Sequence, residues 1–155
     1  MGKTHEYKAH LTWIGNRGNG TATYPGYGRE YRVAIRGKAD LVGSANPMFR
    51  GDPLKHDPED LFLTAISSCH MLSYLALCAR RGITVTAYED NASGTLALDG
   101  DGGRFTEVTL RPQVTIAGGD AALAEQLHHI AHEQCFIANS CSVPIRYEAT
   151  VVRNR

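Results

Sequence analysis

The segment 57–81, DPEDLFLTAISSCHMLSYLALCARR, constrains the fold most, because its central stretch 61–79 contains no Asp, Glu, Lys or Arg. Asp57 is a preferred N-cap residue, and Pro58 fits the first position of a helix. Gly82 is the residue type that most often ends one. We therefore predict a long helix that is apolar on nearly every side, which in a globular protein is a helix buried all round.

An apolar stretch of about 20 residues is also long enough to cross a bilayer. The middle of this stretch carries Ser67, Ser68, His70, Ser73 and Tyr74, however. These polar groups favour a core helix over a membrane span. We therefore expect no membrane association.

The composition is that of a folded protein, with 43% apolar and 21% charged residues in a chain of 155 residues. This length predicts a single domain over residues 1–155. Sixteen basic residues balance sixteen acidic ones without a block of like charge, so no nucleic-acid partner is expected. The first residues, MGKTHEYKAH, lack the pattern of a signal peptide. A cytoplasmic location with reduced cysteines is the expectation.

The segments around the helix alternate between β-prone and turn-like residues. Three strands forming a meander are predicted before the helix, at 7–15, 21–28 and 29–37. The stretch 38–56 shows no convincing period, and we interpret it as a long functional loop. After the helix we predict two strands (83–98 and 103–118), a second helix capped by Asp120, and a final strand (143–152). The order βββ-α-ββ-α-β indicates an α+β fold with antiparallel sheets.

Cys69 and Cys78 lie on the long helix and Cys135 and Cys141 follow much later. Nine residues separate Cys69 from Cys78, which places them on opposite sides of the helix and roughly 13 Å apart along it. They therefore cannot form a disulfide with each other. We interpret Cys78 as a buried core residue, since free cysteine often behaves as a small hydrophobe. Periodicity alone does not say which of the two is reactive.

Two other kinds of site have to be weighed. His128, His132 and Cys135 are spaced i, i+4 and i+7, which is able to supply three metal ligands. Such helical histidine pairs are frequent, and we interpret these histidines as surface residues on a solvated helix face. A cysteine hydrolase would pair Cys69 with His70. Neighbouring helical residues point about 100° apart, so His70 is poorly placed to activate Cys69.

Several motifs together resemble the OsmC/Ohr family of organic hydroperoxide reductases. They are DPEDLFLTAISSCH, a second cysteine 66 residues after Cys69, WIGNRGNGTAT, FRGDP and, as in one branch of the family, CFIANS. The resemblance covers nearly the whole chain. It implies an OsmC-like fold with antiparallel sheets around long buried central helices, in an intertwined homodimer with its sites at the subunit interface.

The resemblance further implies a thiol-dependent peroxidase that uses neither a metal nor an organic cofactor. Cys69 matches the cysteine that attacks the peroxide and becomes a sulfenic acid, and Cys135 matches the cysteine that resolves it as a disulfide. An external dithiol, lipoyl-type or thioredoxin-like, would restore the thiols. The family commonly has proline after the second cysteine, whereas this chain has Phe136. Cys141 is therefore an alternative resolving residue.

The family's thiolate is held by an arginine that a glutamate fixes. Glu59 matches the glutamate, Arg50 best matches the arginine, and Arg17 is the rival. Physical chemistry asks for such a cation, because an ordinary cysteine has a pKa of about 8.5 and burial raises it. Glu59 precedes Cys69 by ten residues, about 15 Å along a helix. It must then act through a loop arginine or from a second subunit.

Apolar side chains are expected to line the peroxide site, and the candidates are Met48, Phe49, Phe62 and Met71. Two alternatives to peroxide turnover remain open at the level of the sequence. One is a stress sensor or small-molecule-binding protein on the same scaffold, whose Cys69 is oxidised without turnover. The other is the metal-binding protein described above.

Overall fold

The computed structural model describes residues 2–154 and has an α+β fold, as predicted. The chain divides into two compact parts, of which the first ends at Leu61 and the second begins at Phe62. The boundary lies within the first turns of helix α1 (Pro58–Arg80). The two parts are described separately below.

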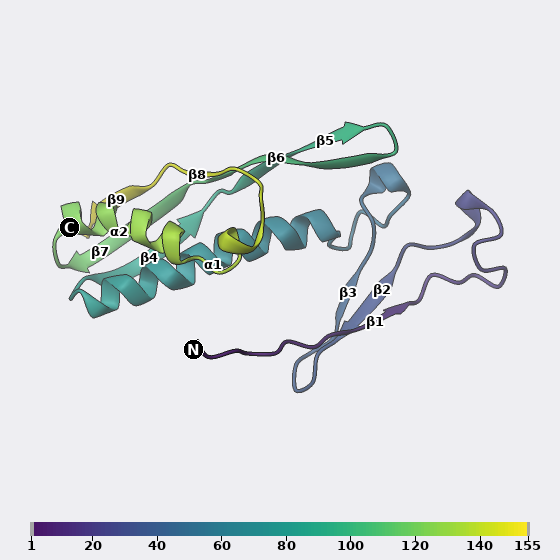
Figure 1. Cartoon of the computed structure of the whole chain (residues 1–155), viewed down its shortest axis with the longest axis horizontal. Helices are drawn as coiled ribbons and strands as arrows, with labels where there is room; N and C mark the ends of the chain where they lie inside the picture. The colour runs from purple at the N-terminus through teal and green to yellow at the C-terminus, as the bar shows by residue number, and fades with distance from the viewer. Residues whose placement is uncertain (1, 155) are drawn as a thin grey trace. The chain divides into compact units, whose positions relative to one another are not determined.

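The first part contains one antiparallel sheet in the order β1-β2-β3, formed by β1 (His10–Trp13), β2 (Tyr31–Ala34) and β3 (Leu41–Gly43) (Figure 1). The predicted meander of three strands is therefore present, but its members differ. The stretch 21–28 is not a strand; it contains a 3₁₀ turn at Tyr24–Gly26. Pro25 has no N–H to donate to a sheet, which favours this turn. The third strand instead comes from the beginning of the stretch that we interpreted as a loop.

Helix α1 begins and ends as the sequence predicts. The Asp57 carboxylate accepts a bond from the Asp60 N–H (2.9 Å), and the Asp60 carboxylate accepts one from the Asp57 N–H (3.3 Å). This reciprocal arrangement satisfies donors that every helix start leaves free. At the other end Gly82 has a φ of 71°, and the Ile83 N–H donates to the Cys78 carbonyl (2.9 Å). A left-handed residue after the last turn is the usual helix stop.

The second part has six strands where three were predicted. They are β4 (Thr84–Asp90), β5 (Ser93–Asp99), β6 (Gly102–Leu110), β7 (Pro112–Gly118), β8 (Ile145–Tyr147) and β9 (Thr150–Arg153). They form two sheets, β4-β7-β9 and β5-β6-β8. Each predicted strand is interrupted where the chain passes from one sheet to the other, at 91–92, at Arg111 and at 148–149. The Asp90 carboxylate accepts a bond from the Arg111 N–H (2.6 Å) and ties two of these breaks together.

The expectation of purely antiparallel sheets is wrong for this part. β4 pairs with β7 and β5 with β6 in antiparallel fashion, but β8 is parallel to β6 and β9 is parallel to β7. The reason is the connection through helix α2 (Ala121–Gln134), which returns the chain to the same end of the sheet. Asp120 caps α2 as predicted, because its carboxylate accepts the Ala122 N–H (2.9 Å).

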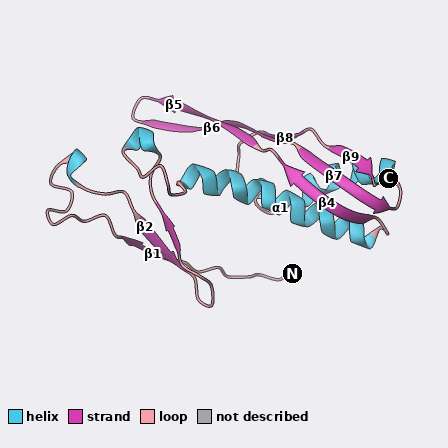
Figure 2. Ribbon diagram, turned by 180° about the vertical axis from the view of Figure 1, so that it is seen from behind, coloured by secondary structure: helices cyan, strands magenta, loops and turns pink. Residues whose placement is uncertain are grey.

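Helix α1 runs along both sheets of the second part (Figure 1, Figure 2). Its buried stripe of Ile66, His70, Tyr74 and Leu77 follows helical spacing and packs against the strands, with α2 completing one of the two cores. The prediction of burial all round is wrong for the single chain, because Leu72 is 63% exposed. By length and composition α1 is the one helix of residues 2–154 that could cross a bilayer. Core helices pass the same test.

Candidate active site

The thiol of Cys69 lies close enough to the thiol of Cys135 to raise the pKa of Cys135. Cys69 is on α1 and is partly buried, whereas Cys135 is the C-cap residue of α2 and is only 1% exposed. All four cysteines are free thiols in this structure. The fold thus brings together two cysteines that are 66 residues apart, the pair that the sequence motifs single out.

The turn after α2 holds the Cys135 side chain in place. The Cys135 N–H donates to the His132 carbonyl (3.3 Å), and the Ala138 N–H donates to Cys135 Sγ (3.5 Å). Burial raises the pKa of the Cys135 thiol, and the contact with Cys69 raises it further, although the Ala138 N–H acts in the opposite direction. Cys135 is therefore a protonated thiol at neutral pH. It is suited to react after its partner has been oxidised.

A largely apolar pocket of about 460 Å³ opens directly beside Cys69. Its lining consists of small or apolar side chains from α1 and the turn after α2, together with two serines: Ala65, Ser68, Cys69, Leu72, Ser73, Phe136 and Ile137. Phe136 is 80% exposed, so much of this wall is open. A small apolar molecule in this pocket would lie against Cys69, while the Cys135 thiol is shielded from it.

Alkylation should distinguish the two thiols. With iodoacetamide at pH 7.5, we expect Cys69 to react at least about tenfold faster than Cys135, because the reactive form is the thiolate and Cys135 is buried with a raised pKa. Mass spectrometry of timed samples measures both rates. In urea the two rates should converge, which serves as the control. Faster modification of Cys135 in the folded protein would contradict this assignment.

The residues of the metal alternative do not converge. His128 is fully buried and its Nδ1 lies 3.0 Å from Nε2 of His70, whereas His132 packs against the Tyr147 ring at 5.7 Å between centroids. Cys135 faces Cys69 instead. Within residues 2–154, no group of three His, Cys, Asp or Glu side chains is arranged to hold a metal ion. The interpretation of His128 as a surface histidine is also wrong, because α2 turns it toward α1.

Arg50 lies in the first part of the chain, at the end of the 3₁₀ turn Pro47–Phe49. Its φ is 67°, and it is the one residue other than glycine in the left-handed region between residues 2 and 154. Such a backbone costs of order 1 kcal/mol and is maintained by its surroundings. Gly51 permits the conformation, since a Cβ there would come within 1.5 Å of the Ala45 carbonyl oxygen. Strain of this kind is frequent at functional sites.

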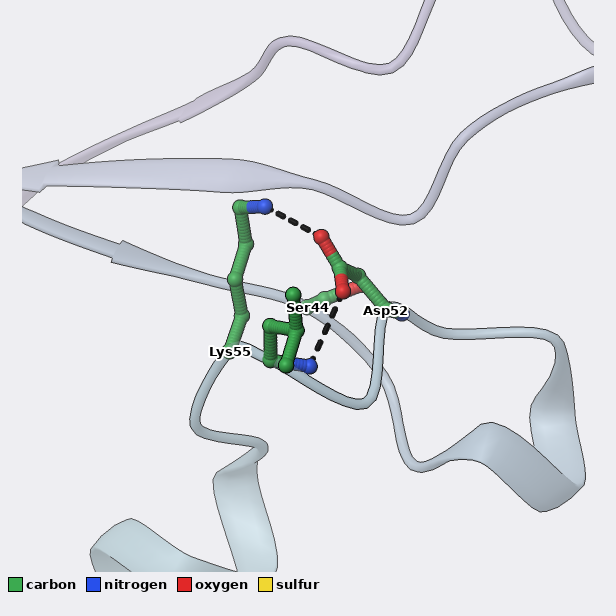
Figure 3. Close-up of polar contacts among 4 residues, drawn as sticks. Ser44, Asp52 and Lys55 are labelled. Carbon is green, nitrogen blue, oxygen red and sulfur yellow. Dashed lines mark hydrogen bonds and ion pairs between the residues drawn. The ribbon is translucent and has the colours of Figure 1, made fainter.

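Polar contacts around Asp52 order the part of the loop that follows Arg50 (Figure 3). The Asp52 N–H donates to Ser44 Oγ (3.0 Å), and Lys55 forms an ion pair with the Asp52 carboxylate. The Asn46 side chain links the loop to the start of α1 by donating to the Asp57 carboxylate (3.0 Å). The guanidinium of Arg50 itself is exposed. The loop therefore presents an accessible cation on a fixed backbone.

Glu59 is partly buried in the same part of the chain. Burial and then the negative charges of Asp57 and Glu59 raise the pKa of Tyr31. The expected ion pair between Arg50 and Glu59 is not among the ion pairs of residues 2–154. The rival cation Arg17 is exposed, in a turn where Asn16 Oδ1 accepts the Gly18 and Gly20 N–H groups.

Comparison with known proteins places this geometry in a family. Residues 51–148 match the model of the OsmC-like protein family. The chain belongs to this family. Among solved structures, an OsmC-like protein of unknown function from Vibrio cholerae is 35% identical, with a TM-score of 0.82 over 95% of this chain and 100% of the other.

Two organic hydroperoxide resistance proteins share the OsmC-like fold at lower identity. The protein from Elizabethkingia anophelis is 18% identical, with a TM-score of 0.68 over 99% of this chain and 100% of the other. The protein from Bacillus subtilis is also 18% identical, with a TM-score of 0.62 over 94% and 98% of the two chains. A comparison with curated protein sequences found no significant match.

The apolar residues that we predicted to line the peroxide site of this OsmC-like protein lie outside the Cys69 pocket. Met48 and Phe49 are exposed in the first part of the chain. Phe62 stacks on Phe105 at 4.9 Å and lines another pocket, and Met71 lines a third. The residues that do line the Cys69 pocket were not predicted. The sequence could have indicated Phe136, because this aromatic residue directly follows Cys135 and therefore has to lie near the two thiols.

The two remaining cysteines have separate surroundings. Cys78 is fully buried in the core of α1, α2 and β7, as predicted. Cys141 is partly buried, and its thiol donates to the Ala138 carbonyl (3.5 Å) beside the Phe62 pocket. Cys135, in contrast, lies close enough to Cys69 for the two thiols to interact.

Proposed function

We propose that this OsmC-like protein is a thiol-dependent peroxidase that reduces organic hydroperoxides to alcohols. The proximity of Cys69, at the wall of an apolar pocket, to the buried Cys135 thiol carries the proposal. An accessible thiol beside a shielded partner is what a two-cysteine peroxidase requires. The names of the Elizabethkingia anophelis and Bacillus subtilis proteins, which refer to organic hydroperoxide resistance, support the same function.

The reaction proceeds in three balanced steps. The Cys69 thiolate attacks the terminal oxygen of the hydroperoxide; an S–O bond forms, the O–O bond breaks, and the alkoxide takes a proton to leave as the alcohol. The resulting sulfenic acid condenses with the Cys135 thiol, which forms the disulfide and releases water. An external dithiol, lipoyl-type or thioredoxin-like, then exchanges with the disulfide and restores both thiols.

The pocket favours an organic substrate over hydrogen peroxide. Leu72, Phe136 and Ile137 supply apolar surface, and burial of each substrate CH₂ group is worth about 0.8 kcal/mol. Ser68 and Ser73 supply hydroxyl groups at the same site, although Ser68 donates to the Thr64 carbonyl (2.7 Å). The cytoplasm is the proposed compartment, because the cycle needs reduced thiols.

Arg50 is the proposed cation for the Cys69 thiolate, with Glu59 as its proposed partner. A homodimer is the proposed assembly, in which the exposed face of α1 around Leu72 would be covered by a second copy. The strained backbone at Arg50 supports a functional role, since an unconstrained loop would place glycine there. Size-exclusion chromatography with light scattering tests the dimer.

Two substitutions at Arg50 distinguish the effect of its side-chain charge on activity from the effect of its backbone conformation on stability. Arg50→Ala and Arg50→Gly should each lower kcat/KM for hydroperoxide about 100-fold, because both remove a cation that stabilises developing charge. Arg50→Gly alone should also raise the free energy of unfolding by about 1 kcal/mol, since glycine tolerates the φ of 67°. Kinetics and urea denaturation measure the two effects. Full activity in both variants, with activity lost in Arg17→Ala, would transfer the role to Arg17.

Steady-state kinetics tests the proposed function directly. The purified protein is mixed with cumene hydroperoxide and reduced lipoamide, and peroxide consumption is followed over many equivalents. Continuous turnover supports the peroxidase. Oxidation of one equivalent without turnover, with dithiothreitol tried as well, would replace it by a redox sensor, and no oxidation of Cys69 at all would exclude both.

A further inference from the structure

Helices α1 and α2 contact each other through a buried pair of histidines that the proposed chemistry does not use. His70 is 1% exposed and His128 is fully buried. His70 Nε2 and His128 Nδ1 are 3.0 Å apart, and one ring must donate its proton to the other. The outer nitrogens of both rings have no hydrogen-bond partner among residues 2–154. Two polar side chains that are buried in this way call for a role beyond packing the core.

A second bond between the same helices follows one turn further along. The Tyr74 hydroxyl donates to the Ala124 carbonyl (3.0 Å), and the Tyr74 ring stacks on His128 with 3.8 Å between centroids. His70 and Tyr74 are four residues apart on α1, and His128 and Ala124 are four residues apart on α2. Four residues rise about 6 Å on either helix. Both hydrogen bonds can therefore form together only when the helices are antiparallel and in one register.

The rest of this interface does little to define a register. The neighbouring buried residues Leu77, Leu127 and Ala131 make apolar contacts, which are not directional. A hydrogen bond, in contrast, weakens steeply once its distance and angle change. Buried polar groups fix the register of packed helices in other systems, at some cost in stability. His70, His128 and Tyr74 are the polar side chains that join α1 to α2 in this way.

The same helices carry the two thiols. Cys69 is the residue next to His70, and Cys135 follows His128 by seven residues, or two turns on the same side of α2. A slide of α1 by a single residue would move Cys69 by 1.5 Å and turn it by 100° away from Cys135. Disulfide formation tolerates only a narrow range of Cα and Cβ separations.

We propose that His70 and His128 are positioning residues, whose mutual hydrogen bond fixes the register of α1 against α2 and so sets the Cys69 thiol opposite the Cys135 thiol. This inference rests on the proposed function to the extent that a Cys69–Cys135 disulfide is part of the cycle. It assigns the histidine pair to the resolution step, in which the disulfide forms, and to neither peroxide binding nor the attack by Cys69.

The test measures disulfide formation apart from peroxide turnover. In a Cys141→Ser background, the protein is equilibrated in glutathione buffers of stepped potential, and alkylation followed by mass spectrometry gives the fraction of Cys69–Cys135 disulfide. The variant His70→Phe/His128→Phe removes both hydrogen-bonding partners and keeps two rings, so the core remains filled. Tyr88→Phe is the control, because it removes a different buried polar group, a hydroxyl on β4 that has no hydrogen-bond partner among residues 2–154.

We expect the equilibrium constant for the disulfide to fall at least tenfold in the double Phe variant and to change less than twofold in Tyr88→Phe. The thermal midpoint should be unchanged or higher in the double Phe variant. His70→Gln/His128→Asn, which places amide groups near the two bonded nitrogens, should recover part of the loss. An equilibrium constant within twofold of the parent in a folded double Phe variant overturns the proposal.

A milder variant covers the case in which the double Phe protein does not fold. Tyr74→Phe removes only the bond to Ala124 and should lower the equilibrium constant about threefold; no change there would also count against the register. Failure of the proposed function has a different signature. A protein without peroxide turnover whose disulfide equilibrium still depends on His70 and His128 loses the peroxidase assignment and keeps the positioning role.

Discussion

Replacing Cys69 by serine is expected to reduce hydroperoxide consumption to the uncatalysed rate, a loss of at least about a thousandfold, because a serine hydroxyl is not ionised near neutral pH and cannot form the sulfenic acid. Replacing Cys135 by serine is expected to give a different result. The Cys69 sulfenic acid should still form, so one equivalent of peroxide is consumed rapidly and turnover then stops.

Mass spectrometry with dimedone, which traps sulfenic acids, distinguishes these two outcomes. Cys135→Ser should carry dimedone on Cys69 after peroxide treatment, and Cys69→Ser should carry none. Cys141→Ser is the matched control, because Cys141 is a partly buried thiol six residues from Cys135 whose hydrogen bond goes to Ala138. Full turnover in Cys135→Ser combined with lost turnover in Cys141→Ser would make Cys141 the resolving residue.

The sequence predicts α1 well because the signals for its ends are local. Asp57, Pro58 and Gly82 act within one turn of the helix terminus, and the structure shows each in its expected place. The positions of the strand breaks, in contrast, are not determined by local sequence signals. Arg111 lies between two β-prone stretches and has no turn residue beside it except Pro112. The chain changes sheet there because of pairing with β8 and β9, which are formed by residues far along the sequence.

The candidate site, like the fold, has features that follow from local sequence patterns and others that depend on contacts between distant residues. Helical periodicity excludes a Cys69–Cys78 disulfide, but it does not identify Cys135 as the partner of Cys69; family motifs were needed for that. The spacing of His128 and His132 is compatible with a solvated face, yet His128 is buried because its partner His70 lies 58 residues away. Contacts between residues this far apart depend on how the two helices pack. The pattern within one helix therefore cannot predict them.

The buried histidine pair should make stability depend strongly on pH. Burial lowers the pKa of His70 to about 4, with His132 adding to the shift and Asp90 opposing it. Burial and the neighbouring His70 lower the pKa of His128 to about 3. Tyr74 and Tyr147 stack on the pair. Both rings are therefore neutral in the folded protein at any pH above about 4.

Unfolded histidines have a pKa of about 6.5, so below that pH the unfolded chain binds two protons that the folded chain does not. The stabilising effect of the neutral pair is fully present above pH 6.5 and is lost as the pH falls through 6.5 toward 4. The expected loss between pH 7 and 4.5 is on the order of 3–5 kcal/mol, a large share of a typical folding free energy. Urea denaturation at stepped pH measures it.

The double variant His70→Phe/His128→Phe links this measurement to the structure. Without titratable rings in the core, its unfolding free energy should be nearly constant over the range in which the parent loses stability. His5→Asn, at an exposed position, should retain the parent's slope. An equal slope in the parent and the double Phe variant would mean that other groups cause the acid sensitivity. Because the same pair is proposed to set the thiol register, acid conditions that charge it should loosen the α1–α2 contact and the Cys69–Cys135 alignment together.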